Sequence, residues 1–83
     1  MEHYLILARS VTYAQRMQRA VSRAGIRCRM FRAPRDLSDS GCAYAIELEP
    51  ANLANALYAV YGSALGPVRV FLYQNGSYRE VSV

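Results

Sequence analysis

The sequence has few of the residues from which disulfide, metal and catalytic sites are built. Its 83 residues include two cysteines, Cys28 and Cys42, and one histidine, His3. Two cysteines cannot form the disulfide framework of a small secreted protein, and without a C-x-x-C pair or a Cys/His cluster there is no zinc motif. A Ser/His/Asp set, a dinucleotide-binding glycine motif and a phosphate-binding loop are also missing. We therefore expect no metal and no cofactor, and any chemistry has to run through cysteine.

Long apolar runs are absent as well. The longest stretch without charge, Pro50 to Val68, is interrupted by Asn, Gly, Ser and Pro residues, so it lacks the roughly 20 apolar residues of a membrane span. Residues 1–4 show neither the basic start nor the apolar core of a secretory signal. With 53% hydrophobic residues and only three Pro, the chain has the composition and length of one small folded domain over residues 1–83. We expect a cytoplasmic protein with no membrane partner.

Lysine is missing too, and the ten arginines are unevenly placed. Eight of them lie in residues 1–35, where Glu2 is the one acidic residue. Residues 36–83 hold two arginines against five acidic residues. The net charge of +4 is therefore concentrated in the first part of the chain.

The first part of the chain has the pattern of strand, helix and strand. Residues 4–8 are a wholly apolar run of strand length. A possible helix cap begins at Ser10, Thr12 and Gln15 fit a capping box, and Gly25 fits the end of the helix. Apolar residues recur between them at helical spacing: Tyr13, Met17, Ala20, Val21 and Ala24. The opposite, solvated side carries Arg16, Arg19 and Arg23. Residues 26–31 alternate as a strand, with Ile26, Cys28 and Met30 on one face.

The second part of the chain begins with turn chemistry from Ala33 to Gly41, which predicts a surface loop. Residues 43–48 alternate as a half-buried strand, and Pro50 then opens a charge-free helix over about 51–61. The core side of that helix carries Leu53, Ala56, Leu57 and Val60. Residues 68–73 alternate as a further strand, and Asn75-Gly76 predicts a hairpin that returns the chain as a short edge strand.

This order of elements predicts an α+β fold, the ferredoxin-like β-α-β-β-α-β two-layer sandwich with an extra C-terminal hairpin strand. Both helices would cover one face of the sheet. The other face would expose a basic and aromatic set of side chains: Arg27, Arg29, Phe31, Ala43, Ala45, Arg69, Phe71 and Tyr73. We expect such a surface to be covered.

The segment from Ala33 to Ile46 (APRDLSDSGCAYAI) resembles the signature of a small family of selenium/sulfur carrier-like proteins. In that family a Pro-containing turn leads through a Ser-rich loop to a single Cys at the start of an apolar strand. The chain departs from it at Ala43, where the family usually has Gly, and in the added Asn75-Gly76 hairpin. The resemblance implies that Cys42 carries sulfur or selenium, and that the protein is a carrier rather than a turnover enzyme.

A persulfide carrier needs an accessible thiolate, and the residues around Cys42 favour one. Ser40-Gly41 could form a small anion-binding nest of backbone N–H groups, and Arg32 and Arg35 are near in sequence to favour the charged form. Ser38 and Ser40 could hydrogen-bond a bound persulfide, although such residues are usually local turn caps. Cys42 could equally be a small buried apolar residue, as free cysteines often are.

The resemblance also implies partners: a persulfide donor such as a cysteine desulfurase, and an unknown acceptor protein. The donor would dock through the loop and the edge formed by Arg32 and Arg35. Cys28 is expected to pack in the core, with a resolving role toward Cys42 as the alternative. His3 is expected to be exposed, with nothing near it in sequence to make it a base.

Two other functions are compatible with the sequence. RNA-recognition domains share this order of elements, and Phe31, Phe71 and Tyr73 could imitate their stacking surface, but residues 41–45 supply only one aromatic where their third strand needs two or three. A non-catalytic interaction subunit is the other alternative. The open sheet face and the charge-free helix, with Tyr58 and Tyr61 outside its core side, favour a homo-oligomer.

Overall fold

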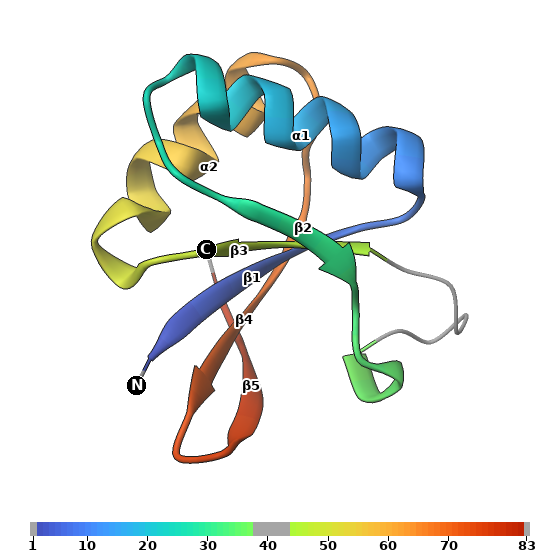
Figure 1. The fold of residues 1–83 in the computed structure, drawn as a ribbon, viewed down its shortest axis with the longest axis vertical. Coiled ribbons are helices and arrows are strands. Elements are labelled where there is room, and N and C mark those ends of the chain that lie inside the picture. The colour runs from blue at the N-terminus through green and yellow to red at the C-terminus, as the bar shows by residue number, and fades with distance from the viewer. Residues whose placement is uncertain (1, 38–43, 83) are drawn as a thin grey trace.

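The computed structural model describes residues 2–37 and 44–82, and its elements follow the predicted order (Figure 1). The five strands are β1 (His3–Ala8), β2 (Arg29–Arg32), β3 (Tyr44–Leu48), β4 (Arg69–Gln74) and β5 (Ser77–Val81). The two α-helices are α1 (Val11–Arg23) and α2 (Leu53–Gly62), and two single-turn 3₁₀ helices are η1 (Arg35–Leu37) and η2 (Pro50–Asn52).

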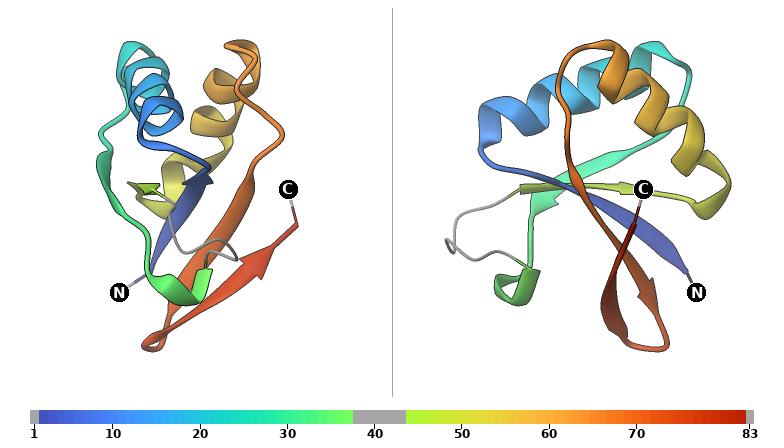
Figure 2. Two further views of the ribbon diagram at one scale, coloured as in Figure 1. Left: turned by 90° about the vertical axis from the view of Figure 1, so that its right-hand side faces the viewer. Right: turned by 180° about the vertical axis from the view of Figure 1, so that it is seen from behind.

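The strands form one antiparallel sheet in the order β2-β3-β1-β4-β5. Both helices lie on the same face of this sheet (Figure 2). The first four strands have the ferredoxin-like arrangement, and β5 extends the sheet beyond β4 through the predicted hairpin. Asn75 and Gly76 have φ angles of 55° and 82°, as a two-residue hairpin turn of type I′ requires. The predicted α+β fold with its extra strand is confirmed.

Helix α1 is capped by Ser10, and the predicted capping role of Thr12 is wrong. The Ser10 backbone is extended, with φ −155° and ψ 165°, so its hydroxyl can accept a hydrogen bond from the Tyr13 N–H at 3.2 Å. Thr12 lies inside the first helical turn, where its backbone has no such geometry. The end of the helix is as expected, since Gly25 has a φ of +80°.

The main core lies between the helices and the sheet. It contains Met17 and Val21 from α1 and Ala56 and Val60 from α2, packed on apolar residues of β1, β3 and β4. Leu53 and Leu57 pack against it as predicted, and Arg16, Arg19 and Arg23 are exposed on the outer side of α1. No helix within the described ranges is long and apolar enough to cross a membrane.

A second core forms on the other face of the sheet, and this corrects two expectations. Ala33 and Leu37 are 8% and 6% exposed and cluster with Leu5, Ala45 and Phe71. The segment after β2 is therefore not wholly a surface loop, because its apolar residues turn through η1 onto the sheet. For the same reason the open face does not expose Ala45 or Phe71. Arg29 and Arg69 remain exposed there, Arg27 is exposed in the segment before β2, Phe31 and Tyr73 are half-buried, and Ala43 lies outside the described residues.

Candidate functional site

The site expected from the sequence is only partly within the described residues. Cys42, Ser38, Ser40 and Gly41 lie outside them, so the structure does not test their proposed roles. Arg32 and Arg35 are described: Arg32 ends β2, Arg35 begins η1, and both side chains are exposed.

Arg32 is fixed at the end of the sheet where β3 begins. Its backbone pairs with that of Tyr44, and its guanidinium carbon lies 5.7 Å from the centre of the Tyr44 ring, within cation–π range. Tyr44 follows Cys42 by two residues in the sequence. The Arg32–Tyr44 pair therefore sets a positive charge at the sheet end that adjoins residues 38–43.

Cys28 has the setting of a packing residue. It is a free, half-buried thiol just before β2, packed against the main core, with its Sγ 4.0 Å from the carbonyl oxygen of Gln18. Burial raises the pKa of this thiol above its ordinary value, and a hydrogen bond with Ser22 offsets only part of that effect. Cys28 is thus held in the protonated, poorly nucleophilic form at neutral pH.

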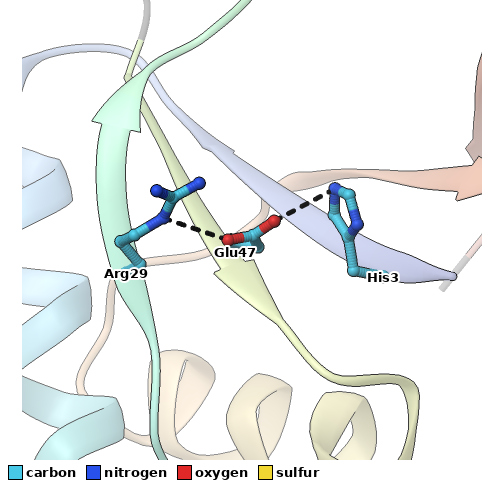
Figure 3. A network of polar contacts seen from close by, with 3 residues as sticks. All are labelled: His3, Arg29 and Glu47. Atoms are coloured by element: carbon cyan, nitrogen blue, oxygen red, sulfur yellow. Dashed lines mark hydrogen bonds and ion pairs between the residues drawn. The ribbon is translucent and has the colours of Figure 1, made fainter. Parts of the chain in front are cut away.

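His3 is not the exposed bystander that the sequence predicts. Its side chain is 24% exposed, and its Nε2 lies 3.2 Å from a carboxylate oxygen of Glu47 (Figure 3). The other carboxylate oxygen accepts a hydrogen bond from the Nε of Arg29 at 3.1 Å. Three strands, β1, β3 and β2, thus supply one row of polar contacts across the open sheet face.

Aromatic rings complete the surroundings of His3. Its imidazole stacks on Tyr73 with the ring centres 4.8 Å apart, and Tyr78 lies 4.9 Å from Tyr73. Burial, with the nearby Tyr73 and Glu47, raises the pKa of Tyr78 above its ordinary value. A sequence signal for this cluster exists in the alternation of β1, which puts His3 on the face of Leu5 and Leu7. Its partners come from distant segments and depend on strand order, so sequence reasoning missed them.

The His3 cluster is remote from the Arg32–Tyr44 pair. Tyr4 pairs with Leu48 at one end of β3, and Ala8 pairs with Tyr44 at the other. Four residues of strand separate these ends, which is about 13 Å at the usual rise. His3 is therefore badly placed to act as a base near Tyr44. Within residues 2–37 and 44–82, no three His, Cys, Asp or Glu side chains gather as a metal site requires.

The aromatic sheet face, named for RNA binding, is less exposed than expected, whereas the aromatic residues of α2, named for self-association, are exposed. Phe71 is only 6% exposed, which removes one of the three aromatics from the supposed RNA-stacking surface. Tyr58 and Tyr61 on α2 are 85% and 46% exposed, so the charge-free helix does present aromatic side chains to solvent.

Comparison with known proteins gives one match. The sequence profile of the family described as "Putative Se/S carrier protein-like" matches residues 3–64, from the start of β1 to the turn after α2. This range contains Cys42, Arg32 and Arg35. No curated protein and no solved structure matches the chain.

Proposed function

The chain belongs to the putative Se/S carrier protein-like family, and we propose that it carries sulfur or selenium on the thiol of Cys42. The observation that carries this proposal is the family match over residues 3–64, which spans the Ser-rich segment and Cys42. The exposed arginines at the adjoining sheet end support it.

The transfer needs only thiol chemistry. The Cys42 thiolate attacks the outer sulfur of a donor persulfide, R–S–SH; a new S–S bond forms, the donor S–S bond breaks, and the donor leaves as R–S⁻. The product is Cys42–S–SH, which keeps the proton of the outer sulfur. An acceptor thiolate then repeats the attack and releases Cys42 as thiolate. No oxidant, reductant or cofactor is consumed, and selenium can replace the outer sulfur atom.

The contrast between the two cysteines supports the choice of Cys42. Cys28 packs against the main core, and burial raises the pKa of its thiol, which lowers its nucleophilicity. Four polar or charged residues shortly precede Cys42 in the sequence: Asp36, Ser38, Asp39 and Ser40. Two arginines, Arg32 and Arg35, lie upstream of them. Cations near a thiol favour the thiolate.

The remaining site residues have positioning and docking roles in this proposal. Ser38, Ser40 and the backbone of Gly41 hydrogen-bond the terminal sulfur or the thiolate. Arg32 and Arg35, both exposed, favour the charged sulfur and dock the donor. The donor is an enzyme that itself bears a persulfide, of the cysteine desulfurase class, and the acceptor is a protein thiol.

We also propose that the protein self-associates through α2. Tyr58 and Tyr61 are exposed on a helix that carries no charge, and such aromatic, uncharged surfaces are enriched at protein interfaces. Light scattering at micromolar concentration should give more than the monomer mass of 9.3 kDa. A monomer mass would exclude this part of the proposal, and Tyr58→Ser should shift an assembled protein toward monomer.

A transfer assay tests the carrier function. A cysteine desulfurase is loaded with radiolabelled sulfur from cysteine and mixed with reduced wild type, Cys42→Ala or Cys28→Ala. Label should move to wild type and to Cys28→Ala, and should be lost in Cys42→Ala while the circular dichroism spectrum is unchanged. Equal labelling of wild type and Cys42→Ala would overturn the proposal.

A further inference from the structure

Charge is segregated between the two layers of the molecule. Residues 11–28, which form α1 and its exit, carry four arginines and no acidic residue. Residues 50–68, which contain η2 and α2, carry no charged side chain at all. By contrast, Glu47 and Glu80 lie on sheet strands and pair there with Arg29 and Arg69. The helix layer is therefore positively charged and contains no carboxylate of its own.

Three of these arginines line one hollow. Arg16, Arg19 and Arg23 are exposed on one side of α1, and with Ala20, Ser63 and Leu65 they surround an open depression of about 280 Å³. The depression lies between α1 and the segment that follows α2, because both contribute lining residues. Its size is close to the lower end of small-molecule sites, about 300 Å³.

Contacts within the protein do not explain this arrangement. None of the three guanidinium groups makes a hydrogen bond or an ion pair with the part of the chain that the structure describes. The carbonyl groups at the end of α2 are already occupied, because Ala59, Val60 and Tyr61 accept hydrogen bonds from the N–H groups of Ser63, Ala64 and Leu65. Like charges three and four residues apart on a helix repel one another. A bound anion would relieve that repulsion.

The shape of the hollow indicates which anion fits. Guanidinium groups bind phosphate oxygens with two parallel hydrogen bonds, which is geometry that lysine does not offer. From Arg16 to Arg23 the helix rises by seven residues, roughly 10 Å, which is longer than one phosphate group. Ser63 adds a hydroxyl, and Leu65 and Ala20 add apolar surface. We propose that this hollow binds a small molecule with two or three linked phosphates, a site that goes beyond the proposed sulfur transfer on Cys42.

Calorimetric titration at fixed ionic strength tests the proposal. The probes are tripolyphosphate, a nucleoside triphosphate and inorganic phosphate, and they separate recognition of the phosphate chain from recognition of the attached group. We expect tripolyphosphate to bind at least tenfold more tightly than inorganic phosphate. If the nucleoside triphosphate binds more tightly than tripolyphosphate, the natural ligand is a nucleotide. If the two bind equally, the site recognises the phosphate chain alone. Both results support the site.

Two charge-matched variants localise the binding. Arg19→Gln removes the central guanidinium of the hollow, and Arg79→Gln removes another exposed arginine, on β5. Affinity for tripolyphosphate should fall at least tenfold in the first variant and less than twofold in the second. Equal losses in both, or no binding at millimolar concentration, would overturn the proposal. Tighter binding of a single-stranded RNA oligonucleotide than of tripolyphosphate, lost in Arg19→Gln, would also overturn it, in favour of a nucleic-acid surface.

Discussion

The guanidinium carbon of Arg32 lies 5.7 Å from the centre of the Tyr44 ring, and the two residues are backbone partners where β2 and β3 pair. Strand pairing fixes both backbones, so the position of this charge does not depend on a flexible side chain alone. Cys42 is two residues before Tyr44 in the sequence. Through this pair the fold can place a positive charge that favours the thiolate form of Cys42.

Removing the Arg32 charge should make Cys42 less reactive. In a Cys28→Ser background, Arg32→Gln should slow the reaction of Cys42 with iodoacetamide at pH 7 about threefold, because loss of one nearby cation raises a thiol pKa by about half a unit. The rate is measured by mass spectrometry over a series of pH values. Arg79→Gln removes the same charge from β5 and should leave the rate within about 1.5-fold. Equal slowing in both variants would show that Arg32 has no local effect.

Leu37 should contribute to stability although it lies in a segment rich in turn residues. Leu37→Ala opens the cluster that it forms with Leu5 and Phe71, and it should lower the free energy of unfolding by about 2 kcal/mol in urea denaturation. The control is Val11→Ala, a truncation at a residue that is 40% exposed, which should change it by less than about 0.5 kcal/mol. Similar values for the two variants would mean that the second core is not formed in solution.

The raised pKa of Cys28 gives a pH dependence with a defined sign. The folded protein holds the Cys28 proton more tightly than the unfolded chain, whose thiol has the ordinary value of 9.0. The stability that this supplies is present below pH 9 and is lost as the pH rises through the raised pKa. In Cys42→Ser protein, iodoacetamide should therefore react with Cys28 more slowly in the folded state than in urea at pH 8. Equal rates in the two states would contradict the burial of this thiol.

His3 should stabilise the fold without taking part in transfer. His3→Ala removes both the contact with Glu47 and the stack on Tyr73, and should cost about 1 kcal/mol in unfolding free energy. His3→Phe keeps a ring on Tyr73 and should recover part of that loss. Both variants should accept sulfur at the wild-type rate, because Glu47, the contact of His3 on β3, is three residues or about 10 Å along the strand from Tyr44. Loss of transfer in a folded His3→Ala protein would give His3 a direct role.

Local patterns in the sequence predicted the fold because they act over a few residues. Alternation identified the strands, helical spacing identified both helices, and Asn75-Gly76 identified the hairpin. For the cap of α1 the sequence offered both Ser10 and Thr12, because they carry equivalent hydroxyl groups and only the backbone angles decide between them. This difference of two residues is about half a helical turn and leaves the topology unchanged.

What the sequence did not predict depends on residues that are distant in the chain. The packing of Leu37 beside Phe71 requires the sheet to exist before η1 can cover it. The contact between His3 and Glu47 requires β1 and β3 to be neighbours in the right register. In the candidate site, Arg32 ends β2 and Arg35 begins η1, both exposed, and the roles of these arginines, of Cys42 and of its neighbours are still predictions.

The most direct test of the carrier function is to locate the transferred sulfur atom. Reduced protein is incubated with a cysteine desulfurase and free cysteine, capped with an alkylating reagent, and digested for peptide mass spectrometry; a known sulfur carrier serves as the positive control. We expect the mass of one added sulfur on the peptide that contains Cys42 and none on the peptide that contains Cys28. An unmodified Cys42, under conditions that label the known carrier, would contradict the proposed function.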